Sequence, residues 1–241
     1  MPGKPGFFFF MNKISVTINN KSFFIYIRDD ADESVAAEIF KQREYRIAED
    51  IIRDAKDSVI DVGSHVGFFT LYARLLNENV PIIAIEPDPK NIEQLKKHLR
   101  ENNISSVTVI EGAVAADAGR RHLALAKDSH NHRLLGRAEP KDGKSVIVNT
   151  WSLSDILKKC IINSISLVKI DIEGGEYELF RGINPEDFKK INSFVIEYHL
   201  AGGKNQKVIE DILRENGFGV RVFPSKFDKK MGFIFAVNKR K

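Results

Sequence analysis

The sequence predicts an α/β fold with an open, mostly parallel β-sheet whose last strand runs antiparallel, preceded by a β-hairpin and a helix. Two observations lead to this prediction. Short apolar strands alternate with segments of helical spacing between residues 58 and 216, which is the order that a parallel sheet requires. A closing pair of strands, at 220–223 and 233–237, follows the last of these helices, so one strand of the pair reverses direction.

Composition is that of one globular domain. The chain has 241 residues, of which 43% are apolar and 29% charged, enough for a single α/β core. We expect residues 1–55 to form a cap on the same domain as residues 56–241. The net charge of +4 lies partly in the C-terminal tail and does not demand a nucleic-acid partner.

Other features of the sequence indicate in which compartment the protein is found. One cysteine, Cys160, excludes an internal disulfide framework and fits a reducing compartment. No apolar run reaches the roughly 20 residues that cross a bilayer, and no targeting signal is evident, so we expect a cytoplasmic protein without a membrane partner. Residues 1–10 read as a dispensable extension.

The N-terminal quarter predicts a hairpin and one helix. Apolar residues alternate on both sides of Asn19-Asn20 over residues 13–28, which indicates a hairpin with a tight turn. Residues 32–55 have helical spacing and predict a single helix. The strand edge of the hairpin leaves homodimerisation open.

A strand, a glycine turn and a helix are predicted over residues 58–72. Gly63 and Gly67 let a ligand approach the backbone beside the unpaired N–H groups of the helix start. Asp61 precedes the turn, where a carboxylate could reach that ligand. The alternative is a tight turn with no ligand.

The second strand ends on Glu86, nineteen residues after Gly67. In dinucleotide-type folds an acid about 20 residues beyond the glycines accepts the ribose hydroxyls. The spacing G-x-x-x-G is not the diphosphate pattern, which favours a nucleoside ligand such as S-adenosylmethionine. The third strand ends before Gly112 and Ala113, which leave space for an adenine ring. An ordinary surface role for Glu86 is the alternative.

Two acids follow the fourth strand, with a third candidate after the fifth. Asp171 and Glu173 share a face of an extended backbone and could orient a hydroxyl, act as a general base or hold a divalent ion. The alternative for Asp171 is to cap the next helix. The fifth predicted strand, residues 193–197, leads into His199.

The segment between the third and fourth strands is less regular. Strands are expected at 121–126 and 145–148, and a helix at 151–159. Between the two strands, His130 and His132 lie in a loop where solvation, substrate contact and metal binding all stay open.

These motifs together resemble the FkbM family of S-adenosylmethionine-dependent methyltransferases, from about residue 39 to 223. Asp-x-Gly-x-x-x-Gly begins at Asp61, Glu-Pro is at residues 86–87, and Lys-x-Asp-x-Glu-Gly-x-Glu runs over 169–176. Glu-Tyr-His at 197–199 is similar to the family's late strand. Ser64-His65 replaces the common Ala-Asn in the turn, and residues 153–155 depart from Leu-Asp-x.

The resemblance implies a Rossmann-like class I methyltransferase with a seven-stranded sheet, which methylates a hydroxyl of a glycan or small molecule. The cofactor-binding residues expected on this basis are Asp61, Gly63, Ser64, His65, Gly67, Glu86, Pro87, Gly112, Ala113 and Asp171. The expected catalytic residues are Asp171, Glu173 and His199, with Glu176 and the His130/His132 loop as weaker candidates.

We assign no metal ligand from the sequence. Two rival functions stay open. The first is an RNA or protein methyltransferase, supported by the basic tail, Arg120-Arg121 and Arg133. The lack of an Asn/Asp-Pro-Pro-aromatic phrase argues against the nucleic-acid version. The second is a non-catalytic nucleotide-binding protein, against which the run of buried acids argues.

Overall fold

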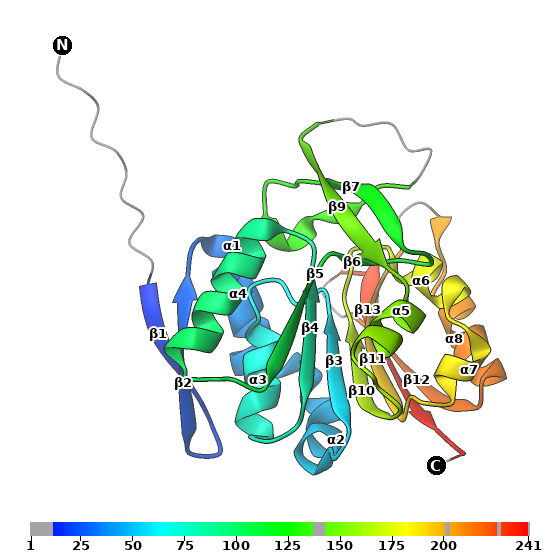
Figure 1. The fold of residues 1–241 in the computed structure, drawn as a ribbon, viewed down its shortest axis with the longest axis horizontal. Coiled ribbons are helices and arrows are strands. Elements are labelled where there is room, and N and C mark those ends of the chain that lie inside the picture. Colours follow the sequence, from blue (N-terminus) through cyan, green and yellow to red (C-terminus); the bar gives the residue numbers. More distant parts are fainter. Residues whose placement is uncertain (1–11, 137–142, 201–202, 226–227, 241) are drawn as a thin grey trace.

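The computed structural model describes residues 12–136, 143–200, 203–225 and 228–240, so the proposed extension at residues 1–10 lies outside it. A seven-stranded sheet forms its centre (Figure 1). Every neighbouring pair is parallel except those of β13, which runs antiparallel to both of its neighbours, as predicted. In spatial order the strands are β12 (Phe218–Pro224), β13 (Met231–Asn238), β11 (Ser193–His199), β10 (Ile165–Ile170), β3 (Ser58–Val62), β4 (Ile82–Glu86) and β5 (Val107–Glu111).

Two cores cover the two faces of this sheet, because successive side chains of a strand point to opposite sides. Val59 packs in one core, and Ile60 and Val62 pack in the other. The core of Val59 includes α2 (Glu49–Asp54), α3 (Phe68–Leu76) and α4 (Pro89–Glu101). The core of Ile60 includes α5 (Leu153–Lys159), α6 (Glu176–Gly182), α7 (Pro185–Phe188) and α8 (Lys207–Glu215).

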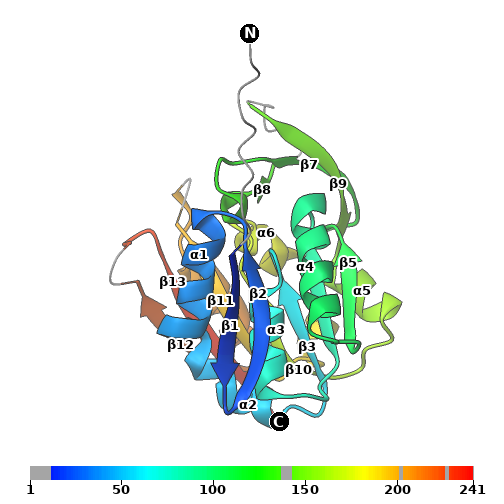
Figure 2. The same cartoon turned by 90° about the vertical axis from the view of Figure 1, so that its left-hand side faces the viewer.

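The predicted hairpin is present as β1 (Asn12–Ile18) and β2 (Lys21–Ile27), beside α3 and α4 in Figure 2. Asn19 and Asn20 both have positive φ, 50° and 65°, as the common two-residue hairpin turn requires. His98 of α4 holds the hairpin. Its Nε2 accepts the N–H of Tyr26 at 2.9 Å, while Nδ1 donates to the carbonyl of Val66 at 2.7 Å. The imidazole of His98 therefore connects the hairpin to the glycine turn.

The single helix predicted over residues 32–55 is wrong. The segment consists of α1 (Asp30–Ala36), a π-helical stretch η1 (Ala37–Gln42), a 3₁₀ stretch η2 (Glu44–Ala48) and α2. The break falls at Arg43, whose φ of 55° is left-handed and whose guanidinium bonds Glu49. The turn places Tyr45 edge-on against Phe69 and Phe233, with ring centroids 4.9 and 5.6 Å away. Aromatic packing and the ion pair thus override the helical spacing.

A second sheet lies above the carboxyl ends of the central strands (Figure 1). The two strands that the sequence predicts at 121–126 and 145–148 are both present, with shifted bounds. Trp151 belongs to the second of these strands and not to the following helix. Ser152 caps that helix in a reciprocal bond with Asp155. In spatial order the second sheet contains β6 (Ala113–Val114), β9 (Ser145–Trp151), β7 (Gly119–Ala124) and β8 (Arg133–Leu134). A 3₁₀ turn, η3 (Ser129–Asn131), precedes β8.

In the described ranges, no helix combines the length and the apolar character that a membrane span requires.

Candidate active site

A cavity of about 420 Å³ opens at the carboxyl ends of β3, β4, β5, β10 and β11. This volume lies within the usual range of small-molecule sites, roughly 300–1,000 Å³. The three predicted catalytic residues, Asp171, Glu173 and His199, line it, as do His130 and His132. The predicted cofactor residues on its wall are Gly63, Ser64, His65, Glu86, Pro87, Gly112, Ala113 and Asp171.

Glu86 is held rigidly at the tip of β4. One carboxylate oxygen accepts the N–H of His65 at 2.8 Å, and the other accepts the N–H of Asp88 at 3.0 Å and the amide of Asn91 at 3.2 Å. Burial raises the pKa of Glu86, and these three donors oppose the rise. The oxygen that accepts only from His65 keeps a lone pair for a ligand hydroxyl.

The glycine turn uses the N–H groups of its first two residues within the protein. Gly63 and Ser64 both donate to the carbonyl of Ile85 at 3.0 Å. A Cβ on Gly63 would lie 1.8 Å from the carbonyl oxygen of Asp171, so this glycine allows β3 and β10 to approach. Ser64 contributes differently. Its buried hydroxyl lines the cavity and has no hydrogen-bond partner among the described residues.

Asp61 and Gly67 do not line the cavity. Asp61 is fully buried and accepts the hydroxyl of Thr70 at 2.7 Å, with the ammonium of Lys169 3.4 Å from its other oxygen. Burial raises the pKa of Asp61, although Lys169 and Thr70 oppose it. A Cβ on Gly67 would lie 2.1 Å from Leu95, so that glycine serves helix packing.

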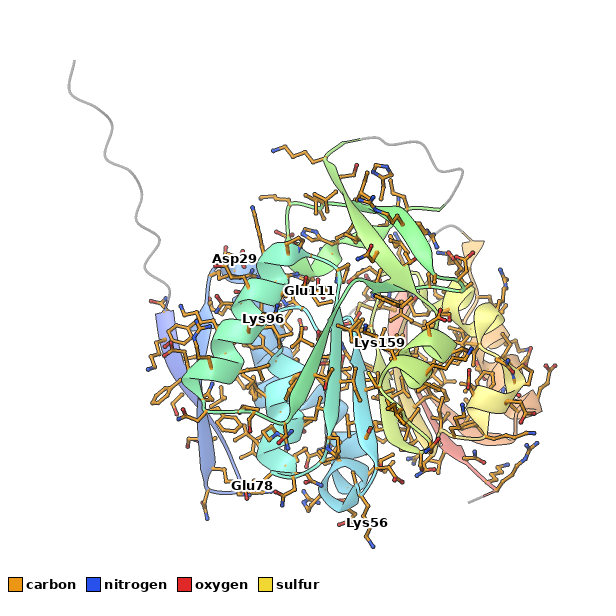
Figure 3. The ribbon with its side chains drawn as sticks, viewed as in Figure 1. Asp29, Lys56, Glu78, Lys96, Glu111 and Lys159 are labelled. Carbon is orange, nitrogen blue, oxygen red and sulfur yellow. The ribbon has the colours of Figure 1, made fainter. Side chains whose placement is uncertain are left out.

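An apolar wall adjoins Gly112 and Ala113. Leu123 of β7 and Leu134 of β8 also line it, so the second sheet supplies part of the wall where an adenine ring is expected. Glu111, which ends β5, points elsewhere: its carboxylate pairs with Lys96 at 2.6 Å on the outside of the molecule (Figure 3). The tip of β5 therefore contributes small residues and no charge to the cavity.

The acidic end of the cavity brings Asp171, Glu173 and His199 together. His199 Nε2 lies 3.5 Å from Glu173, and its Nδ1 donates to Glu176 at 3.1 Å. Burial and then Asp171 raise the pKa of Glu173 to about 7, which His199 partly opposes. Burial alone would lower the pKa of His199, but Glu176, Asp171 and Glu173 outweigh it and raise that pKa to about 10. At neutral pH His199 is therefore a cation.

Glu176, a weaker candidate from the sequence, lies behind this group and not on the cavity wall. Its carboxylate is fully buried and accepts the N–H groups of Ile172 and Gly174 as well as His199 Nδ1. Its role is to position the residues after β10.

Sequence reasoning missed Lys169 and Glu197 as members of the site. Lys169 donates to the carbonyl of Gly63 at 2.8 Å and lies between Asp61 and Asp171. Burial would lower its pKa, yet Asp61, Asp171 and Glu197 together raise it. A lysine inside an apolar strand was the available signal. Burial and Asp171 raise the pKa of Glu197, which lines the cavity at the end of β11.

The histidine loop closes over the cofactor side. His132 lies 2.9 Å from Asp88, with only 10% of its side chain exposed, so solvation does not describe it. The hydroxyl of Ser129 lies 2.8 Å from His65 Nε2 and accepts from Arg28 at 3.2 Å. Burial, followed by Arg28, lowers the pKa of His65 well below its usual value, so this imidazole is neutral.

Arg121, one of the basic residues that supported an RNA substrate, is not available to a phosphate. Its guanidinium bonds Glu178 at 2.5 Å and the carbonyl of Leu135 at 2.8 and 3.0 Å. The residue is only 7% exposed. Its charge ties the second sheet to α6.

The sheet order with one antiparallel strand, and the acid at the tip of β4 beside a cavity, are those of the Rossmann-like class I methyltransferase fold, whose members use S-adenosylmethionine. The spare lone pair of Glu86 and the unpartnered hydroxyl of Ser64 fit the polar groups of this methyl donor. The chain belongs to the methyltransferase FkbM domain family, whose model matches residues 61–220.

Curated relatives carry the same activity. The chain is 29% identical over 192 residues to the 31-O-demethyl-FK506 methyltransferase FkbM of Streptomyces tacrolimicus, covering 68% of this chain and 73% of the relative. It is 26% identical over 212 residues to the methyltransferase sdnD of Sordaria araneosa, with coverage of 76% and 80%. It is 22% identical to the hexuronic acid methyltransferase AglP of Haloferax volcanii, with coverage of 82% and 80%.

Solved structures share the fold. Aeropyrum pernix fibrillarin with bound S-adenosyl-L-methionine superposes with a TM-score of 0.51 at 12% identity, covering 98% of this chain and 85% of that one. The METTL16 methyltransferase domain gives 0.52 at 14% identity, with coverage of 93% and 86%. At such identities the likeness concerns the fold alone.

Proposed function

We propose that this methyltransferase transfers its methyl group to a hydroxyl of a small molecule or glycan in the cytoplasm, with Glu173 as the general base. The observation that carries the proposal is one cavity with two chemically different ends. Glu86 and Ser64 lie at one end, and Asp171, Glu173 and His199 lie at the other. A donor held at the first end directs its reactive group towards acids that can receive a proton.

S-adenosylmethionine, when bound, supplies a methyl group on a sulfonium. Glu86 would hold the ribose hydroxyls, and Gly112, Ala113, Leu123 and Leu134 would enclose the adenine. Asp61 supports this end indirectly, by fixing Lys169 behind the glycine turn. These residues provide position and alignment, which are the main sources of rate in a transfer between two bound molecules.

At the acidic end, the Glu173 carboxylate accepts the proton of the acceptor hydroxyl while the new O–C bond forms and the S–C bond breaks. A methyl ether and S-adenosylhomocysteine leave, and Glu173 returns its proton to solvent. A pKa of about 7 suits a base that operates near neutral pH. His199, which is already protonated, cannot accept this proton; it stabilises negative charge on the base and the acceptor oxygen.

The relatives support the same acceptor class. By their names, one acts on an oxygen of FK506 and another on a hexuronic acid. The cavity agrees, since its acceptor end is polar and acidic and suits hydroxyl-rich molecules. The engagement of Arg121 by Glu178 weakens the nucleic-acid alternative.

The test is a calorimetric titration of the full chain with S-adenosylmethionine, with NAD as the control, followed by an assay of S-adenosylhomocysteine release with a panel of sugars and polyols. We expect binding of the methyl donor, no response to NAD and release that depends on an acceptor hydroxyl. Folded protein that does not bind the donor would contradict the assigned cofactor end. If turnover occurs only with RNA or protein, the acceptor belongs to that class and is not a small molecule or glycan.

A further inference from the structure

We propose that Asp171, Glu173 and His199 bind a divalent cation, which holds the acceptor through two of its oxygen atoms. The inference deepens the proposed function and rests on it. One ligand atom from each of the three side chains lies within 4.8 Å of the others. Asp171 and Glu173 follow β10 and His199 ends β11, so two hydrogen-bonded neighbouring strands supply the ligands.

The orientation of His199 fits a metal ligand. Its Nδ1 bonds Glu176, whose side chain is fully buried, and this contact directs Nε2 to the carboxylates. Nε2 then lies 3.5 Å from Glu173 and 3.9 Å from Glu197. Metal-binding histidines commonly have this carboxylate partner on the other nitrogen, because it sets the ring orientation and makes the free nitrogen more basic. Coordination requires Nε2 without a proton, so cation affinity should rise with pH.

The charges around the triad point independently to a cationic ligand. Glu197 lines the same cavity, its side chain is 12% exposed, and no described residue donates a hydrogen bond to it. Glu176 also has a buried oxygen, Oε2, without a partner among the described residues. Among the cationic side chains of the described residues, only Lys169 and His199 form hydrogen bonds or ion pairs with the four carboxylates, while the ammonium of Lys204 donates to the carbonyl of Gly174 instead. Buried carboxylates without partners are costly, and a divalent ion would balance the excess.

The position of Lys169 leaves room for the ion. Its ammonium lies 3.8 Å from Asp171 Oδ2 and donates to the carbonyl of Gly63, on the side of the glycine turn. Glu173 and His199 lie on the cavity side, where the acceptor enters. Lys169 thus compensates Asp61 and one oxygen of Asp171, and it does not reach Glu173 or Glu197 through any hydrogen bond.

The ligand set indicates the kind of ion and the kind of acceptor. Two carboxylates and one imidazole suit a six-coordinate ion such as Mn²⁺ or Mg²⁺, which retains several open positions. Two adjacent oxygens of a sugar or polyol can fill two of these positions. A bound hydroxyl becomes more acidic, which makes its proton easier for Glu173 or solvent to accept. We therefore expect acceptors with neighbouring oxygens over isolated alcohols.

The test uses Mn²⁺ as the probe, with the full chain treated with chelator and then dialysed. Electron paramagnetic resonance measures free Mn²⁺ during a titration, with and without S-adenosylhomocysteine. We expect one Mn²⁺ per chain. Glu173→Gln and His199→Gln should each weaken binding at least tenfold, and Glu176→Gln by roughly tenfold, the lower limit for a residue that orients a ligand. Glu111→Gln, a matched change outside the cavity at the tip of β5, should leave Mn²⁺ affinity unchanged.

A second measurement needs no variant. Pulsed electron paramagnetic resonance of the Mn²⁺-loaded protein should detect coupling to one imidazole nitrogen. Absence of stoichiometric Mn²⁺ binding, absence of nitrogen coupling, or equal affinity in folded Glu173→Gln and His199→Gln would each overturn the cation site. The calorimetric titration with S-adenosylmethionine separates the two proposals, because failure of donor binding contradicts the proposed function whatever Mn²⁺ does.

Discussion

The two ends of the cavity satisfy their carboxylates in opposite ways. At the cofactor end, Glu86 accepts three hydrogen bonds from neutral N–H groups within the protein. At the acceptor end, Glu173 and Glu197 lie near Asp171 and His199 and have few hydrogen-bond donors around them. The pKa values of Glu173 and Glu197 are both raised. The first arrangement is rigid before any ligand arrives. The second arrangement leaves carboxylates that can still take up a proton or a cation, as catalysis or cation binding requires.

In the proposed function, binding and chemistry draw on different parts of one sheet edge. The ends of β3, β4 and β5 would hold the methyl donor in a preformed site, whereas the ends of β10 and β11 provide groups whose state depends on pH and ligand. Lys169 connects the two ends, since it contacts the glycine turn and lies between Asp61 and Asp171. Four substitutions test this division.

The largest effect is expected from Glu173→Gln. Loss of a general base lowers kcat by roughly 10²–10⁴-fold, while the dissociation constant of S-adenosylmethionine stays near that of the wild type. In chelator-treated wild type, Glu173 must be deprotonated, so activity should rise with pH through about 7 and fall as His199 loses its proton near 10. The variant should lack the rising limb. Undiminished turnover at saturating donor would remove Glu173 as the base.

Lys169→Met should mainly affect stability. Removing the ammonium leaves Asp61 buried with only the hydroxyl of Thr70, and breaking a buried ion pair costs roughly 3–5 kcal/mol. Urea unfolding followed by circular dichroism measures the change. The matched control is Lys96→Met, which breaks an exposed pair with Glu111 and should cost about 0.5 kcal/mol or less. Equal stability of the two variants would mean that Lys169 does not connect the two ends.

Glu86→Ala should weaken S-adenosylmethionine binding by roughly 100-fold, because charge-assisted bonds to ribose hydroxyls disappear. Calorimetry measures the affinity, and Glu111→Ala, at the neighbouring strand tip, serves as the control. If the acceptor end is independent, turnover at saturating donor should be largely retained. A variant that binds the donor normally would return Glu86 to a structural role.

The smallest effect is expected from Ser129→Ala, which removes contacts of the histidine loop with His65 and Arg28. These two hydrogen bonds support the loop and do not touch the donor, so roughly 1 kcal/mol of their loss should reach donor binding, and donor affinity should fall about fivefold. Ser22→Ala in the hairpin, which removes an exposed contact with Thr17, should change nothing measurable in donor binding. If both variants bind alike, the loop does not help to close the cofactor end.

Local patterns were sufficient for much of the architecture. Asn19-Asn20 predicts a hairpin because both residues tolerate the positive φ that the structure contains. The start of α4 is also local, because the side chain of Asp88 accepts the N–H of Lys90. Glu86 and Asp171 reach the cavity because parallel strands end on one edge.

Long-range contacts decided the remainder. The second sheet pairs β6 with β9 across more than thirty residues, so no local spacing could indicate that Leu123 and Leu134 line the cavity beside Ala113. The break at Arg43 depends on partners later in the chain, Glu49 and Phe233, and is invisible to a helical repeat.

The sequence by itself determined that a nucleoside-binding α/β sheet would present Glu86, Asp171 and Glu173 at one edge, because strand alternation and the direction of parallel strands follow from local pattern. Only the tertiary structure decided which face each strand residue occupies. Asp61 points with Val59 to the core of α3, where Thr70 and Lys169 bind it, whereas Ile60 and Val62 point to the opposite core. Alternation sets which residues share a face; packing selects the face.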